Sequence, residues 1–295
     1  MNLLLTGANG QVGFELQRSL APLGKVHALN HAQCDLSKPD DLRRVMREIK
    51  PGIVVNAAAY TAVDKAESER DRAFAINGTA PGILGEEAAR LNALVVHYST
   101  DYVFDGKKTA PYVETDPPNP QSVYGASKLA GEQALQASGA RYLIFRTSWV
   151  YGAHGGNFAK TILRLAGERE ELKVVADQFG APTSAALIAD VTAQLIGDYN
   201  RRAAGDFPLG LYHLAASGVT QWQEYACAVV QAAYNSGKAL KLRMERIHPI
   251  TTAEYPLPAP RPSNSRLDTS KLMTTFGLHM PDWRVGLEHM LKQIL

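Results

Sequence analysis

A chain of 295 residues, 45% of them hydrophobic, is long enough to bury a substantial core as one large domain or two modest ones. Its 31 lysines and arginines against 29 acidic residues give a formal net charge of +2, which gives no reason to expect nucleic acid or an anionic membrane as a partner. The two cysteines, Cys34 and Cys227, lack the spacing of a disulfide framework or a zinc site, and neither a signal peptide nor an apolar run of membrane-spanning length is visible. We therefore expect a cytoplasmic globular protein.

The first half of the chain alternates short apolar runs with helical patterns. Strands are expected over 2–6, 25–30, 52–59, 93–100 and 142–152, and helices over 11–24, 38–50, 69–92 and 124–137. Because the strands are apolar on both faces, they suit a parallel sheet covered by helices. The prediction is an α/β fold with a doubly wound parallel sheet of the Rossmann type.

After residue 152 this rhythm becomes irregular. A basic amphipathic helix is expected over 157–170, a loop over 175–184, a helix over 186–199 and a strand over 210–217, while prolines concentrate in 255–268. We expect a dinucleotide-binding domain over 1–153, to which 185–215 returns. A smaller α/β substrate-binding domain is expected over 154–184 and 216–295.

Three glycines at a period of three residues follow the first expected strand. Gly7, Gly10 and Gly13, in TGANGQVG, stand between that strand and the first helix. Glycine permits a tight turn and a close approach to a pyrophosphate, and a helix N-terminus offers it free N–H groups. A glycine turn without a ligand is the alternative, but the flanking strand and helix favour a dinucleotide site.

The second expected strand ends at Asn30, where a site selective for NAD carries an acidic residue for the ribose hydroxyls. A neutral side chain, with His31 next to it, does not repel a 2′-phosphate. We therefore predict NADPH as the cofactor, with NADH as a second usable donor because no nearby arginine requires the phosphate. Asp35 and Leu36 stand where the adenine would rest, although Asp35 also suits a helix cap.

Tyr124 and Lys128 are four residues apart in an expected helix, so they share one face, with Cβ atoms about 5–6 Å apart. A nearby ammonium favours the phenolate, so Tyr124 can act as a general acid for a carbonyl oxygen while Lys128 tunes it and binds the cofactor ribose. Such a pair alone is more often a half-buried aromatic beside a solvated lysine. The upstream glycine turn, and the hydroxyls of Ser99 and Thr100 at a strand end, favour the catalytic interpretation.

Together, TGANGQVG, the NAA of 56–58, Thr100 and the Tyr124–Lys128 pair resemble the extended short-chain dehydrogenase/reductase family over the first 150 residues. This family includes epimerases, dehydratases and reductases of nucleotide sugars, so the fold leaves the reaction open. Its 4,6-dehydratases carry Asp and then Glu after the threonine. Here Asp101 is followed by Tyr102, so an elimination would lack its base.

Other phrases are similar, nearly end to end, to one group of reductases within that family. They are NAAAYTAVDKAE, STDYVFDG, VYGASKLAGE, FRTSWVYG, NFAKTILRLA, QFGAPT and RPSNSRLD. The resemblance implies NADPH-dependent reduction of the C4 ketone of dTDP-4-dehydro-L-rhamnose to dTDP-L-rhamnose, the last step in making a sugar donor for bacterial surface polysaccharides such as lipopolysaccharide O-antigen.

The same resemblance assigns roles to residues. Tyr124 would protonate the ketone oxygen, Lys128 would assist, and Thr100 would bond the same oxygen. The implied cofactor-binding residues are Gly7, Gly10, Gln11, Val12, Asn30, Asp35, Leu36, Ala59, Tyr60, Thr61, Tyr98, Tyr124 and Lys128. Tyr102, Val103 and Trp149 would line the sugar pocket, and the candidates for the diphosphate are Lys160, Arg164, Arg261, Asn264 and Arg266. Core packing of Trp149 and solvation of these arginines are the alternatives.

Histidines and carboxylates show no metal-ligand spacing, so no metal site is predicted, and His97 in its apolar strand is interpreted as a core residue. The resemblance alone allows Mg²⁺ at a subunit contact, with Glu15 or Asp64. Monomer and homodimer both stay open, as does a 6-deoxy-L-talose product. The alternative functions are a nucleotide-sugar epimerase that recycles bound NAD⁺ and a non-catalytic regulatory subunit that binds NADP.

Overall fold

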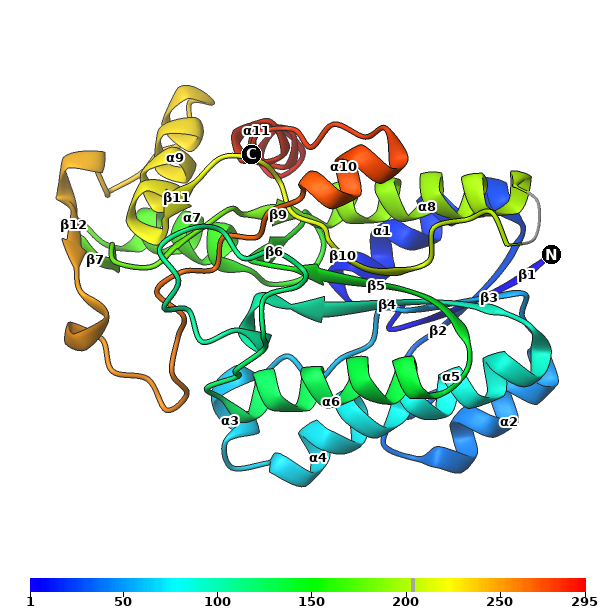
Figure 1. Ribbon diagram of the computed structural model, residues 1–295. Coiled ribbons are helices and arrows are strands. Elements are labelled where there is room, and N and C mark those ends of the chain that lie inside the picture. The colour runs from blue at the N-terminus through cyan, green and yellow to red at the C-terminus, as the bar shows by residue number, and fades with distance from the viewer. Residues whose placement is uncertain (203–204) are drawn as a thin grey trace.

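A six-stranded parallel sheet forms the centre of the computed structural model, which describes residues 1–202 and 205–295 (Figure 1). Its strand order is β10-β5-β4-β3-β1-β2, and each neighbouring pair runs parallel. The strands are β1 (Asn2–Thr6), β2 (Lys25–Leu29), β3 (Ile53–Asn56), β4 (Leu94–Thr100), β5 (Arg141–Thr147) and β10 (Gly210–His213). The predicted doubly wound parallel sheet is confirmed.

Helices cover both faces of this sheet (Figure 1). One face carries α1 (Gln11–Leu20) and α8 (Ala185–Arg201), and the other carries α2 (Pro39–Ile49), α5 (Ala80–Leu91) and α6 (Val123–Ala137). Leu3 and Leu5 pack in the core beneath α1 and α8, whereas Leu4 packs in the core beneath α2 and α5. The strands are apolar on both faces because alternate side chains enter two different cores.

Two expected elements are interrupted in the structure. The helix expected over 69–92 consists of α4 (Arg70–Phe74), a π-helical segment (Ala75–Thr79) and α5, preceded by the short α3 (Val63–Ala66). The strand expected over 142–152 ends at Thr147 and continues as β6 (Val150–Tyr151), because Trp149 adopts a φ of 49° that an extended strand does not allow. The strand expected over 52–59 stops at Asn56.

A second lobe lies at the end of the sheet toward which the β4 arrow points (Figure 1). It contains α7 (Phe158–Glu168), β7 (Leu172–Val175), α9 (Trp222–Asn235), β12 (Ile247–Ile250) and α11 (Trp283–Ile294). Strands β7 and β12 pair in parallel, and the helices share a core that includes Ile162, Tyr225, Val229 and Leu287. This lobe therefore has its own apolar core beyond the carboxyl ends of the strands.

Short elements connect the two parts. The loop expected over 175–184 contains β8 (Phe179–Gly180), which pairs with β11 (Thr220–Gln221), and β9 (Thr183–Ser184), which pairs with β6. The remaining elements are α10 (Ser270–Phe276) and the 3₁₀ helices Ala21–Leu23, Asp101–Val103, Met244–Arg246 and Thr252–Glu254. Across the described ranges, no helix combines the length and apolar character that crossing a bilayer requires.

Candidate active site

The glycine turn lies where the strand order of the sheet reverses. Strand β1 has β2 on one side and β3 on the other, and ligands of doubly wound folds bind at such a point. Gly7 has a φ of 75°, and a Cβ built on it would stand 2.6 Å from the backbone nitrogen of Ala58, just after β3. A Cβ on Gly13 would stand 2.0 Å from the carbonyl oxygen of Gly7. Side chains are excluded at these two positions, so the turn packs directly on the backbone after β3 and on itself.

The N-terminus of α1 lies directly after this glycine turn. Its N-cap residue, Gly10, has no side chain to satisfy the first N–H groups of the ten-residue helix, so these donors and their partial positive charge stay available for an anion. Gln11 is held in place from two sides. Asn157 Nδ2, at the start of α7 in the second lobe, donates to its Oε1 at 3.0 Å, and its Nε2 donates to Val150 O in β6 at 3.4 Å. The free N–H groups of α1 and the glycine turn without side chains fit the pyrophosphate of a dinucleotide.

Three of the predicted cofactor residues follow β2. Asn30 Oδ1 accepts hydrogen bonds from the backbone of Ala32 at 3.0 Å and Gln33 at 3.2 Å, so this side chain shapes the turn. Asp35 accepts from both the backbone and the hydroxyl of Ser37, just before α2. Leu36 is buried in the core beneath α2. The cofactor roles of Asn30, Asp35 and Leu36 stay predictions.

A buried asparagine that the sequence analysis missed connects the cofactor loop to α6. Asn77 Oδ1 accepts from the backbone of Tyr60 at 2.8 Å, while its Nδ2 donates to Tyr60 O at 3.0 Å and to Ser127 Oγ at 3.1 Å. Asn77 lies in the π-helical segment, and such insertions are frequent at functional sites. The loop that carries Ala59, Tyr60 and Thr61 is thereby fixed against the helix of Tyr124. A polar residue in an otherwise apolar helical pattern was the available signal.

Helix α6 begins directly against the end of β4. Ser122 caps the helix by accepting from the backbone of Gly125 at 3.1 Å, and a Cβ on Gly125 would stand 2.1 Å from Tyr102 O. This close packing brings Tyr124 to Thr100, whose hydroxyl lowers the pKa of the phenol, while burial, the larger effect, raises that pKa to about 12. The rings of Tyr124 and Tyr102 meet edge to face at 5.4 Å. The structure therefore brings together two of the three predicted catalytic groups through local packing.

Lys128, the third, is buried one helical turn beyond Tyr124. Its Nζ donates to Tyr98 O at 2.5 Å and lies 3.4 Å from His97 Nε2. Burial lowers the pKa of Lys128 to about 8, so it carries its proton at neutral pH. The Tyr98 hydroxyl pairs with Thr192 at 2.8 Å, away from Lys128. Lys128 is thus a fixed cation one helical turn along α6 from Tyr124.

Asp101 is a buried carboxylic acid that lies beside Thr100. Thr100 Oγ1 donates to Asp101 Oδ1 at 3.0 Å and accepts from the backbone of Tyr102 at 3.2 Å. Burial raises the pKa of Asp101 to about 6. The Thr100 hydroxyl therefore has a resting partner from which it can turn to a ketone oxygen.

An aromatic cluster surrounds Trp149, just beyond the end of β5. Trp149 is partly buried and stacks on Trp222 with ring centroids 3.7 Å apart, and Trp222 is fixed by donating to Gln178 Oε1 at 3.0 Å. The ring centroid of Phe158 lies 4.7 Å from that of Trp222. The sequence analysis identified Trp149 but missed Trp222, because nothing in the local sequence places a residue 73 positions further on against it.

The predicted diphosphate candidates lie in three different places. Arg261 lines a small cavity together with Tyr102, Phe104, Asp105, Gln121, Ser122, Pro260 and Pro262, and its Nη2 donates to Asp64 Oδ2 at 2.7 Å. Lys160 donates to the backbone oxygens of Ala153 and Gly155, and Arg164 pairs with Glu168 on the exposed face of α7.

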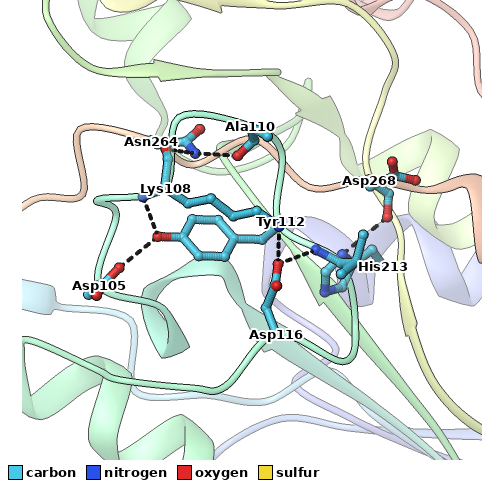
Figure 2. A network of polar contacts seen from close by, with 9 residues as sticks. Asp105, Lys108, Ala110, Tyr112, Asp116, His213, Asn264 and Asp268 are labelled. Atoms are coloured by element: carbon cyan, nitrogen blue, oxygen red, sulfur yellow. Dashed lines mark hydrogen bonds and ion pairs between the residues drawn. The ribbon is translucent and has the colours of Figure 1, made fainter.

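Asn264 and Arg266 instead fix the loop that follows β4, and Figure 2 shows Asn264 against this loop. Asn264 Nδ2 donates to the backbone oxygens of Lys108 and Ala110, and Arg266 donates to Asn264 Oδ1 and Thr109 O. Val103 is fully buried in a cluster with Phe104 and Tyr112. The substrate roles of these residues stay predictions. Within 1–202 and 205–295, no three His, Cys, Asp or Glu side chains are grouped to hold a metal ion.

Comparison with known proteins agrees with this geometry. The family model "RmlD substrate binding domain" matches residues 1–295. The dTDP-4-dehydrorhamnose reductase of Burkholderia thailandensis is 51% identical over 296 residues, which cover 100% of this chain and 99% of that protein. The dTDP-4-dehydrorhamnose reductase of Escherichia coli K12 is 51% identical over 301 residues, covering 100% of this chain and 98% of the relative.

Solved structures show the same fold. A dTDP-4-dehydrorhamnose reductase from Bacillus anthracis, in complex with NADP, superposes with a TM-score of 0.89 at 36% identity and covers 99% of both chains. A UDP-glucose 4-epimerase from Thermus thermophilus, in complex with NAD, gives a TM-score of 0.77 at 21% identity over 100% of both chains. The second likeness shows the fold alone.

Proposed function

This chain belongs to the dTDP-4-dehydrorhamnose reductase family, and on that premise we propose that it reduces the C4 ketone of dTDP-4-dehydro-L-rhamnose to dTDP-L-rhamnose with NADPH. The observation that carries the proposal is the position of Tyr124, Lys128 and Thr100 beside a glycine turn and helix N-terminus that fit a dinucleotide. When bound, the reduced nicotinamide supplies the hydride to C4.

The residues of the chain manage the proton and the charge. Tyr124 donates its phenolic proton to the C4 oxygen as the ketone becomes an alcohol, so one hydride and one proton complete the reduction. The Thr100 hydroxyl leaves Asp101 and donates to the same oxygen, which stabilises negative charge developing there. Lys128, as an ammonium, stabilises the phenolate that Tyr124 becomes.

Protonation of these groups sets the working pH. At neutral pH Tyr124 holds its proton, because its pKa is about 12, and Lys128 is charged, because its pKa is about 8. Raising the pH above about 8 removes the proton from Lys128 first and leaves the phenolate unsupported. The proposal therefore includes an activity that declines on the alkaline side.

The two parts of the chain would divide the substrates between them. We assign the dinucleotide to residues 1–153 with 185–215, and the dTDP-sugar to 154–184 with 216–295. Pairing of β10 with β5, and the separate apolar core of the second lobe, support this division. The aromatic wall of Trp149 and Trp222 suits the apolar face and methyl group of a deoxysugar. The proposal includes a cytoplasmic location.

The test is NADPH oxidation with enzymatically prepared dTDP-4-dehydro-L-rhamnose, followed by NMR of the C4 configuration of the product. We expect rapid oxidation, the rhamnose configuration, and near-complete loss of turnover in Tyr124→Phe. If the product has the 6-deoxytalose configuration at C4, dTDP-6-deoxy-L-talose replaces dTDP-L-rhamnose as the proposed product. Interconversion of sugars without net NADPH consumption would identify an epimerase, and NADPH binding without any turnover would identify a binding subunit.

A further inference from the structure

A chain of buried polar groups crosses the carboxyl edge of the sheet and ends at Lys128. Thr6, Asn56 and His97 stand side by side on β1, β3 and β4, because Thr6 is in register with Asn56 and Asn56 with His97. The Thr6 hydroxyl lies 2.6 Å from the Asn56 amide oxygen, and the Asn56 amide nitrogen lies 3.1 Å from His97 Nδ1. On the other side of the ring, His97 Nε2 lies 3.4 Å from Lys128 Nζ.

The interpretation of His97 as a satisfied core residue is confirmed, and its partners are two specific polar side chains. His97 is only 1% exposed, yet both ring nitrogens face polar partners rather than the apolar clusters on either side of the sheet. Burial, and then the charge of Lys128, lower the pKa of His97 well below its usual range. The ring is therefore neutral, with one N–H and one nitrogen that accepts.

The charge of Lys128 decides which nitrogen accepts. An ammonium has only donors, so a protonated Lys128 requires His97 Nε2 as an acceptor and leaves the ring proton on Nδ1. In the structure the Asn56 amide nitrogen faces His97 Nδ1, so this tautomer requires a half rotation of the amide, which turns the oxygen to His97 Nδ1 and the nitrogen to the Thr6 hydroxyl. With the opposite tautomer, an N–H of the ring would point at the ammonium.

We infer that His97 is a positioning residue for Lys128, with Nε2 accepting one ammonium N–H while Asn56 holds the ring in the tautomer that has its proton on Nδ1. Tyr98 O accepts a second N–H, so the third is left for Tyr124 and the cofactor ribose. This inference rests on the proposed function and deepens the same site.

The other groups near Lys128 do not replace His97. Glu132 follows one turn later on α6 and raises the pKa of Lys128, but Arg146 binds both of its oxygens, at 2.9 and 2.7 Å. The Tyr98 hydroxyl is bonded to Thr192, and Tyr124 is the group that the lysine serves. Loss of the His97 acceptor is therefore expected to make the ammonium less stable and to lower its pKa further.

The tautomer can be measured without substrate. Nitrogen NMR of the whole protein with ¹⁵N-labelled histidine distinguishes a protonated from a bare ring nitrogen, and the signals of His97 are those lost in His97→Gln. We expect a bare Nε2 and a protonated Nδ1 at neutral pH in the wild type, and a changed Nε2 shift in Lys128→Met. A proton on Nε2 in the wild type would overturn the inference.

Kinetics supply the second readout. In His97→Phe we expect kcat to fall about tenfold and the alkaline limb of its pH profile to move down by about one unit, with the KM for the dTDP-sugar nearly unchanged. His97→Gln, whose amide reaches the place of Nε2, should restore most of the rate and of the profile. An unmoved limb in His97→Phe, or a Gln variant no better than Phe, would overturn the inference. A wild type without turnover would refute the proposed function, and the tautomer measurement would still decide the role of His97.

Discussion

Arg261 and Asp64 form an ion pair of 2.7 Å that joins the proline-rich segment 255–268 to α3 across 197 positions of sequence. Asp64 also accepts from the backbone of Ala259 at 3.1 Å, and the bond from Arg261 holds the pKa of this carboxyl below its usual range. Because Arg261 lines the cavity beside Tyr102, this pair fixes the segment that borders that cavity.

The first prediction separates two roles of Arg261. If its guanidinium contacts the diphosphate as well as Asp64, Arg261→Ala raises the KM for the dTDP-sugar about tenfold, whereas Asp64→Asn, which only loosens the segment, raises it about threefold. The KM for NADPH should not change in either. Arg246→Ala, whose ion pair with Glu171 is exposed on both sides, is the control and should resemble the wild type. If both variants raise the KM for the dTDP-sugar equally, and the double variant raises it no further, then Arg261 only holds the segment in place.

The second prediction concerns the support of Trp149. A Cβ on Gly180 would stand 2.8 Å from Trp149 Cε2, and Trp222 packs on the same indole, so Gly180→Ala must displace Trp149. We expect the KM for the dTDP-sugar to rise about tenfold, together with a change in near-ultraviolet circular dichroism from the altered Trp149–Trp222 stack. Gly167→Ala is the matched control, because a Cβ there meets nothing within 4 Å. Unchanged dichroism in Gly180→Ala would show that the indole does not depend on this contact.

Local patterns predicted the parts of the site that depend on neighbours in sequence. The glycine turn is followed at once by the helix it needs, and Tyr124 and Lys128 share a face because they are one helical turn apart. The alternation of strands and helices along the chain likewise predicted a parallel sheet covered by helices, although not the order of its strands. The break at Trp149 escaped prediction, since VY continues the apolar pattern of β5 and only the φ of 49° ends the strand.

Other features depend on contacts between distant segments. The pairing of β7 with β12 joins residues about seventy-five positions apart, and no local pattern specifies it. His97 lies in an apolar strand, so its pattern is that of a core residue, and its partner Lys128 is 31 positions away on a helix that packs against β4. Arg266 shows the opposite case, because a cation in a loop suggests an anion, yet its Nε and Nη2 already donate to Asn264 and Thr109.

The third prediction tests the cofactor choice at Asn30. An aspartate keeps the oxygen that accepts from Ala32 and Gln33, so Asn30→Asp should preserve the turn while adding a charge that repels a 2′-phosphate. We expect the KM for NADPH to rise about tenfold or more and the KM for NADH to stay the same or fall. Steady-state kinetics with both donors measure this ratio, and Asn30→Ser serves as the uncharged control. Equal losses with both cofactors would mean that the residue only shapes the turn.

The fourth prediction follows from the buried carboxyl of Asp101. Burial raises its pKa to about 6, above the value of about 4 expected in the unfolded chain, so the folded protein holds this proton longer. The free energy of unfolding should therefore fall as the pH rises from about 4 to about 6, by up to about 3 kcal/mol, and stay lowered at neutral pH. Asp101→Asn removes the ionisation and keeps an oxygen for Thr100, so it should be more stable than the wild type near neutral pH but not near pH 4.

Urea denaturation at the two pH values measures this difference, and Asp116→Asn supplies a control of opposite sign. Lys108 donates to Asp116 and lowers the pKa of this carboxyl, so its contribution to stability is present at neutral pH and is lost as the pH falls through the lowered pKa. Asp116→Asn should accordingly be less stable than the wild type near neutral pH, with a deficit that shrinks in acid. Equal stability changes at both pH values for Asp101→Asn would show that its carboxyl is ionised at no cost, which would mean that Thr100 and the neighbouring backbone fully compensate its burial.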